Sequence, residues 1–170
     1  MGAGEGHKSR VLRSTDAGRS WRTVLRNQQP KGFFDGMAFD ASGKQGMLFS
    51  DPLHGRLDLY RTRDGGVTWH RLRTGDRPDM NEKEYGFAAS GTSIVLHNSH
   101  VFVATGGAVA RVLRSTDLGN SWSATKVPLQ SGQPSAGVFS IAFEDATTGV
   151  AVGGDYRQPD LDRGNVSRTD

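Results

Sequence analysis

Short apolar runs alternate with polar turns along most of the chain. Residues 36–51 read GMAFDASGKQGMLFSD and residues 140–155 read SIAFEDATTGVAVGGD, so both contain an apolar run, an acidic turn with glycine, and a second apolar run. Residues 91–107, GTSIVLHNSHVFVATGG, have the same outline with weaker identity. Apolar runs of four to eight residues between turn residues are typical of β-strands joined in hairpins. The pattern therefore predicts three antiparallel hairpins.

Further short runs predict a third strand after each hairpin and a fourth strand after two of them. The expected first strands are 36–39, 93–96 and 139–143; the second, 47–49, 101–104 and 150–152; the third, 57–61, 110–114 and 165–168; the fourth, 69–72 and 122–127. The opening segment supplies only a third and a fourth strand, at 10–13 and 21–25. The 23 glycines disfavour long helices. We therefore expect an all-β fold.

A nine-residue motif links the third strand to the fourth. It reads RSTDAGRSW at 13–21, RTRDGGVTW at 61–69 and RSTDLGNSW at 114–122, which gives the pattern S/T-x-D-x-G-x-S/T-W. The aspartate can close an Asx-type turn, the glycine supplies a positive φ, and the tryptophan is expected to insert between neighbouring sheets. The positions assigned these structural roles are Asp16, Gly18 and Trp21, then Asp64, Gly66 and Trp69, then Asp117, Gly119 and Trp122.

Repeats of about fifty residues are typical of a β-propeller with one four-stranded blade per repeat. We therefore predict a partial ring over residues 1–170, of about three to four blades: a half blade at 10–27, blades at 32–73 and 85–128, and an incomplete blade at 137–170. Asp170 stands 53 positions after Asp117, within SRTD, and we interpret it as part of a truncated fourth motif. An arc of blades has two open edges, so we expect the remaining blades to lie in a longer protein.

Charge and composition exclude several classes of partner and site. The 21 Lys and Arg residues are interspersed with 18 Asp and Glu residues, so no basic block predicts a nucleic-acid partner. The absence of cysteine excludes disulfides, a cysteine nucleophile and thiolate metal sites. No apolar stretch is long enough to span a membrane, and MGAGEGHKSR lacks the apolar run of a signal peptide. We expect a soluble chain without a targeting signal.

The repeated motif resembles the Asp-box, or BNR, repeat of sialidases, sortilin-type receptors and many bacterial propellers. Longer phrases, including SDPLHGRLDLYRTRDGGVTW, ATGGAVARVLRSTDLGNSW and GVAVGGDYRQP, are similar to bacterial proteins of the photosystem II stability/assembly factor-like BNR-repeat family. The resemblance implies a propeller that binds or scaffolds other molecules, and a periplasmic or secreted location. It says little about catalysis.

A sialidase-like glycoside hydrolase is the enzymatic alternative. Such an enzyme needs a tyrosine nucleophile with a supporting glutamate, an acidic residue and an arginine cluster for the substrate carboxylate. The candidate tyrosines are Tyr60, Tyr85 and Tyr156, and the glutamates are Glu5, Glu82, Glu84 and Glu144. No FRIP-type arginine motif occurs. The sequence favours a non-enzymatic binding module, and the hydrolase stays open as the alternative.

The sequence predicts neither a metal ion nor a cofactor. A calcium loop of the EF-hand type would place a glutamate eleven positions after its first aspartate, but Asn27, Gly75 and Pro128 stand there. His97 and His100 flank a predicted turn and are expected to face solvent. The glycine-rich stretches at 2–6 and 106–110 do not open a helix, so they do not predict a dinucleotide site.

The candidate binding residues lie where the second strands end. Asp51 and Asp155 end equivalent strands, and arginines follow each of them. Equivalent blade positions lie on one face of a ring, where propellers commonly bind partners. We therefore predict a site for a protein or a small polar ligand, made by Asp51, Arg56, Asp155, Tyr156 and Arg157. The alternative is that the aspartates cap turns and the arginines pair with them.

Three further arginines recur immediately before the motifs. These are Arg13, Arg61 and Arg114. Because they occupy the same position in each repeat, we expect them to make contacts between neighbouring blades.

Overall fold

The computed structural model describes residues 1–2, 4–88 and 90–169, and its regular structure is almost entirely β-strand. Two short 3-10 helices, η1 (Gly6–Lys8) and η2 (Thr74–Asp76), are the exceptions within the described residues. The all-β prediction is therefore confirmed. Asp170, which we interpret as part of a truncated motif, lies outside the described residues.

The first two sheets follow the chain order. Strands β1 (Arg10–Arg13) and β2 (Arg22–Arg26) form a two-stranded antiparallel sheet. Strands β3 (Phe34–Phe39), β4 (Gly46–Leu53), β5 (Arg56–Thr62) and β6 (His70–Arg71) form a four-stranded antiparallel sheet in that order. Each strand pairs with its neighbour in sequence because the connecting turns are short.

The remaining strands form two units that share one connection. Strands β8 (Ile94–His97), β9 (His100–Gly107), β10 (Arg111–Ser115) and β11 (Ser123–Lys126) make the third sheet, and β12 (Ala136–Phe143), β13 (Gly149–Asp155) and β14 (Val166–Thr169) make the last one. Gly106 of β9 pairs with Gly137 of β12 and joins the two units. A further strand, β7 (Glu84–Tyr85), pairs with the end of β9 and was not predicted, because two residues carry no alternating pattern.

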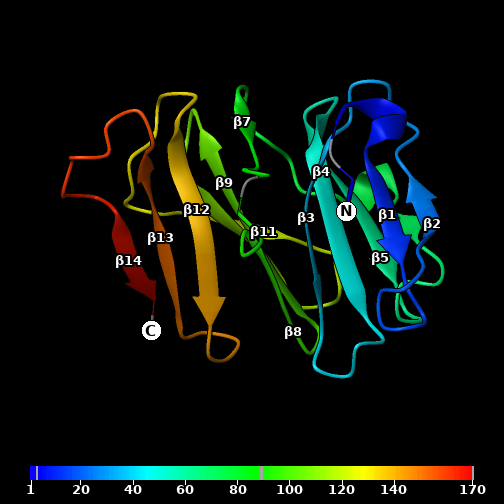
Figure 1. Ribbon diagram of the computed structural model, residues 1–170. Coiled ribbons are helices and arrows are strands. Elements are labelled where there is room, and N and C mark those ends of the chain that lie inside the picture. Colours follow the sequence, from blue (N-terminus) through cyan, green and yellow to red (C-terminus); the bar gives the residue numbers. More distant parts are fainter. Residues whose placement is uncertain (3, 89, 170) are drawn as a thin grey trace.

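The sheets stand side by side in chain order, from β1–β2 to β12–β14 (Figure 1). Strand β8 lies beside both β3 and β12, so the first strands of the last three sheets are neighbours around a common axis. Each sheet therefore stands as a blade, with its later strands farther from that axis. This is the arrangement of a β-propeller, as the repeat spacing predicts.

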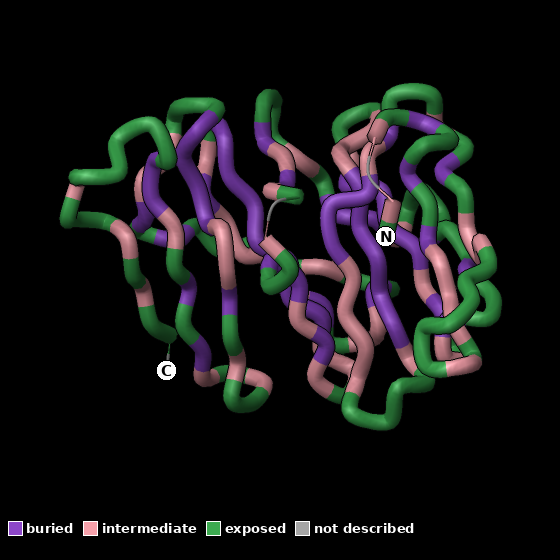
Figure 2. Tube along the Cα trace, viewed as in Figure 1, coloured by how far each residue is buried: buried purple, intermediate pink, exposed green. Residues whose placement is uncertain are grey.

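Three hydrophobic clusters hold neighbouring blades together. One joins Val11 of β1 to Leu48 and Tyr60 of the second sheet. The second lies between the β3–β6 and β8–β11 sheets, and the third lies between the β8–β11 and β12–β14 sheets. Buried residues are concentrated in the middle strands and exposed ones at the turns (Figure 2). Each central sheet is therefore buried on both faces.

The three motif turns share one hydrogen-bonding scheme. In the second of them, the Thr62 hydroxyl donates to Asp64 Oδ1 at 2.8 Å and accepts from the Gly66 amide at 2.9 Å. The Thr68 amide and hydroxyl both donate to the Asp64 carboxylate, at 2.9 and 2.6 Å. The same bonds recur in the turns around Asp16 and Asp117. Each turn is therefore closed by its own side chains.

The tryptophans of these turns differ in burial. Trp69 is 9% exposed and belongs to the cluster with β1, and Trp122 packs against the cluster between the β3–β6 and β8–β11 sheets. Each of these indoles is thus covered by the preceding sheet. Trp21 is 61% exposed, because no sheet precedes β1 among the described residues. The expectation that all three indoles insert between sheets is wrong for Trp21.

The blades have two distinct edges. The turns 14–21, 62–69 and 115–122 follow β1, β5 and β10 and define the box edge. Because neighbouring strands are antiparallel, β3 and β12 begin and β4, β9 and β13 end at the other side, which we call the opposite edge. The predicted binding residues lie at the opposite edge or next to it.

Candidate functional site

A row of four aromatic rings crosses the opposite edge. Tyr85 of β7 packs against Phe87 with ring centroids 5.7 Å apart, and Phe87 packs edge-on against Phe139 of β12 at 4.8 Å. Phe139 is followed by Tyr156 at 6.4 Å. Tyr156 is 60% exposed, so the row ends at solvent. Aromatic side chains that are partly covered and partly open are enriched at protein interfaces.

Glycines under the row allow the rings to lie against the backbone. A Cβ atom on Gly106 would come within 2.4 Å of the Phe87 ring, and one on Gly137 within 2.8 Å of the same ring. Gly107 has φ +88°, and the absence of a side chain there leaves room for Tyr85. Any larger residue at these positions would push the rings away from the junction between β9 and β12.

Hydrogen bonds fix the two ends of the row. The Tyr85 hydroxyl donates to the Pro134 carbonyl at 2.5 Å, which ties β7 to the segment before β12. At the other end, the Arg157 amide donates to Asp155 Oδ1 at 2.9 Å. Hydrogen bonds from Ser135 and from this amide hold the pKa of Asp155 below its usual value. Asp155 therefore caps the turn that presents Tyr156.

Two carboxyl groups, those of Asp35 and Asp51, lie beside the Tyr85 end of the row. Asp35 of β3 is 4% exposed, and its Oδ2 atom has no hydrogen-bond partner among the described residues. Burial, followed by the charge of Asp51, raises the pKa of Asp35 to about 9. Burial, followed by the charge of Glu5, raises the pKa of Asp51 to about 6. At neutral pH this pair therefore retains a proton on Asp35.

β-Bulges orient two of these residues. The register of β3 against β4 shifts between Phe34 and Gly36, which leaves Asp35 as the extra residue. The register of β12 against β13 shifts between Val138 and Ser140, which leaves Phe139 as the extra residue of that strand. Bulges often redirect a side chain next to a functional site. The two blades thus present an acid and an aromatic ring from equivalent positions.

The structure brings most of the predicted binding residues to one region. Burial and the neighbouring Tyr156 and Asp51 raise the pKa of Tyr85, and Arg157 acts in the opposite direction. All three side chains are thus within electrostatic range of the Tyr85 phenol. Asp155 directly precedes Tyr156 in the sequence, so four of the five predicted residues lie around the aromatic row.

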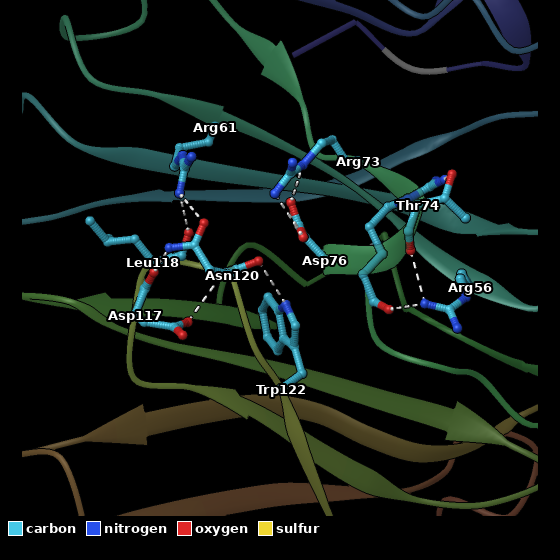
Figure 3. A network of polar contacts seen from close by, with 11 residues as sticks. Arg56, Arg61, Arg73, Thr74, Asp76, Asp117, Leu118, Asn120 and Trp122 are labelled. Atoms are coloured by element: carbon cyan, nitrogen blue, oxygen red, sulfur yellow. Dashed lines mark hydrogen bonds and ion pairs between the residues drawn. The ribbon is translucent and has the colours of Figure 1, made fainter.

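Arg56, the fifth predicted binding residue, contacts the connection after β6 and not the aromatic row. Its guanidinium donates to the Thr74 carbonyl at 2.9 Å (Figure 3). It also donates to the Arg77 carbonyl at 3.0 Å and forms an ion pair with Asp79 at 2.9 Å. These groups belong to the polar connection between β6 and β7, residues 72–83. Arg56 therefore anchors this connection to the start of β5.

The residues considered for a hydrolase have structural contacts. Tyr60 is 4% exposed and packs against Phe34 in a hydrophobic cluster. Glu84 is 2% exposed and forms an ion pair with Arg111 at 2.7 Å. Hydrogen bonds from Arg111 and Thr105 lower the pKa of Glu84 against the raising effect of its burial. Within the described residues, no three His, Asp or Glu side chains form a group that could hold a metal ion.

Sequence reasoning missed several residues of this region. Asp35, Phe87 and Phe139 are not among the predicted binding residues, and Tyr85 is predicted only as a candidate nucleophile. One signal was available: Asp35 and Phe139 directly precede the matching segments GMAF and SIAF. Nothing in the sequence indicates that β7 adds Tyr85 and Phe87 to the same surface.

Comparison with known proteins supports the fold. Residues 60–71 match the BNR/Asp-box repeat family, and this range holds the second motif turn. No curated protein sequence matches the chain. Within the described residues, no helix is long and apolar enough to cross a membrane.

Two solved structures share the architecture at low sequence identity. A structure described as YCF48 bound to D1 peptide is 19% identical, with a TM-score of 0.51, and covers 88% of this chain. A protein of unknown function from Dyadobacter fermentans DSM 18053 is 17% identical, with a TM-score of 0.53, and covers 94% of this chain. The chain spans only 42% and 51% of those two proteins. It therefore carries a BNR/Asp-box repeat on a β-propeller fold, as the sequence predicts.

Proposed function

We propose that the opposite edge binds a segment of a partner protein, with no chemical step. The observation that carries this proposal is the row of rings Tyr85, Phe87, Phe139 and Tyr156, which begins in the protein and ends at solvent. Such a row offers apolar contact at low entropic cost, because each ring has only two rotatable side-chain bonds. The solved YCF48 structure, which shares the fold, contains a bound peptide and supports the same class of ligand.

The charges around the row indicate which peptide fits. Arg157 is exposed at the Tyr156 end and suits a carboxylate of the partner. Asp51 lies at the other end, with Glu5 nearby, and suits a lysine or an arginine. We therefore expect a short segment with an apolar or aromatic residue between a basic and an acidic group.

A peptide library panned against the full chain tests this proposal. We expect selected peptides to lose about tenfold in affinity for Tyr156→Ala and for Arg157→Ala, since each change removes a direct contact. Val67→Ala is the matched control, because Val67 is also an exposed apolar residue but lies at the box edge. Equal affinity for the wild type and both variants would exclude this surface as the binding site.

The enzymatic alternative has a separate readout. A sialidase-like hydrolase would release the fluorophore from a fluorogenic sialoside, whereas a binding module would not. Turnover that is lost in Tyr85→Phe would replace the binding proposal with catalysis. Binding of a small polar ligand in place of a peptide, and membership of a longer BNR-repeat protein, stay predictions.

A further inference from the structure

A polar pocket of about 470 Å³ lies between the second and the third sheet, and we call it the side pocket. The connection between β6 and β7 forms one wall, and the end of the third motif turn with the start of β11 forms the other. Figure 3 shows Asp76 and Arg56 on one side, and Asn120 and Trp122 on the other. Pockets of roughly 300–1,000 Å³ hold small ligands. None of the four rings of the aromatic row lines this one, so a ligand there would be independent of the proposed function.

The motif turn in the wall is held by the preceding sheet. Arg61 Nη1 donates to the Leu118 carbonyl at 2.9 Å (Figure 3). Arg13 Nε donates in the same way to the Gly65 carbonyl of the second motif turn, at 3.0 Å. The expected contacts between blades are thus confirmed for Arg13 and Arg61. Arg114 differs, because its Nε atom is buried without a hydrogen-bond partner in the part of the chain that the structure describes.

The other wall is fixed by ion pairs to both sheets. Arg77 Nη1 bonds to Asp58 of β5 at 2.7 Å, and both side chains are buried. Arg111 of β10 pairs with Glu84 at 2.7 Å and donates to the Asp79 carbonyl at 3.0 Å. The side pocket is therefore formed in advance, which lowers the entropic cost of binding a ligand.

The charges of the side pocket balance each other. Its charged lining residues are Arg56, Arg77, Arg111, Asp76 and Asp79. Each of them has an ion-pair partner at 2.9 Å or less. A charged ligand would have to compete with one of these pairs, whereas a neutral ligand would leave them intact. The pocket therefore favours a ligand that is polar and uncharged.

Two groups of the side pocket can bind the hydroxyls of such a ligand. The Asp79 side chain is 79% exposed, so its carboxylate can accept further hydrogen bonds beside the ion pair with Arg56. Asn120 is exposed, and its amide keeps one N–H beside the bond that it donates to the Asp117 carbonyl. An acceptor and a donor thus line the same space, and a hydroxyl group can use either.

Trp122 supplies an apolar surface in the side pocket. Its Nε1 atom donates to the Gly119 carbonyl at 3.2 Å, so the polar edge of the indole already has a partner. The ring packs against the cluster between the two sheets, but the residue is not fully buried. A flat aromatic ring beside hydroxyl-binding groups fits a pyranose, which has an apolar C–H face and a rim of hydroxyls.

We propose that the side pocket binds a neutral saccharide and does not cleave it. A pyranose ring packs against Trp122, one of its hydroxyls donates to Asp79, and another accepts from the Asn120 amide. This ligand differs from the substrate of a sialidase-like hydrolase, because a sialoside carries a carboxylate and the arginines of the side pocket are already paired.

An array of neutral and sialylated oligosaccharides, incubated with the labelled full chain, tests this proposal. We expect neutral glycans to bind, and calorimetry with the strongest of them should give about tenfold lower affinity for Gly75→Phe. Gly75 lines the pocket, and a Cβ atom there meets no atom within 4 Å, so the new ring can occupy the pocket without displacing the fold. Gly91→Phe is the matched control, because a Cβ atom on Gly91 is equally unobstructed but lies outside the pocket.

The indole N–H signals in NMR spectra locate the bound glycan. The Trp122 signal should shift on titration and the Trp21 signal should not, because Trp21 holds the same motif position outside the pocket. Tyr156→Ala should leave the glycan affinity unchanged, which separates this site from the aromatic row. Absence of binding to neutral glycans, equal affinity for the wild type and Gly75→Phe, or a loss of affinity in Tyr156→Ala would overturn the proposal.

Discussion

Aspartates at the two edges of the blades are in opposite environments. At the box edge, hydrogen bonds from Ser20 and Ser14 lower the pKa of Asp16 to about 2. At the opposite edge, burial and a neighbouring charge raise the pKa of Asp35 to about 9. The carboxylates of the box edge accept several hydrogen bonds each, whereas Asp35 Oδ2 is buried without a donor among the described residues. The box-edge carboxylates therefore stabilise their turns, whereas Asp35 carries a cost of burial at the edge where we propose that a partner binds.

The largest expected effect is at the box edge. Trp69→Ala should lower the free energy of unfolding by about 3–5 kcal/mol, because it leaves a cavity between the first two sheets. Trp21→Ala should lower it by less than about 1 kcal/mol, since that indole is exposed. Urea denaturation of both variants checks this difference. Similar losses for the two variants would show that burial does not distinguish the turns.

A smaller effect of opposite sign is expected for Asp35→Asn. The raised pKa means that the folded state binds more protons than the unfolded state between pH 4 and 9, so stability falls as pH rises through this range. Asparagine cannot ionise, so at pH 8 the variant should be more stable by on the order of 2 kcal/mol. Thermal unfolding at pH 5 and pH 8 measures the change. A pH dependence unchanged from the wild type would contradict the buried charge.

The matched change at the box edge is Asp64→Asn. Hydrogen bonds from Thr68 and Thr62 hold the pKa of Asp64 well below its usual value of 3.8. Stability from this group is present above pH 4 and is lost as pH falls below it. The variant should therefore have a lower Tm at pH 7 and a weaker dependence on pH between 4 and 2. A higher Tm at pH 7 would show that the turn does not need a charged carboxylate.

The smallest expected change in stability is at the end of the aromatic row. Tyr156→Ala should change the free energy of unfolding by less than about 0.5 kcal/mol, because the ring is 60% exposed. Urea denaturation checks this value. A loss of several kcal/mol would mean that the row supports the fold, and the division of roles between the edges would then be wrong.

Most strands could be predicted because their signals are local. The apolar runs at 36–39 and 47–49 lie within β3 and β4, since alternation and turn residues within about fifteen positions select a hairpin. The proposed binding surface is less predictable. Asp51 and Asp155 were identified from equivalent positions in two blades, whereas Asp35 and Phe139 acquire their orientation from bulges that appear only in the strand register.

By itself, the sequence determined the repeated hairpins and the motif turns, because each turn is closed by hydrogen bonds among residues no more than four positions apart. Only the tertiary structure decided which indole is buried, which carboxyl group keeps a proton and which of the three motif arginines holds the turn of a neighbouring blade. Each of these outcomes depends on a neighbouring sheet, whose residues lie some fifty positions away in the chain. Burial and desolvation are properties of that neighbourhood, and no local pattern encodes them.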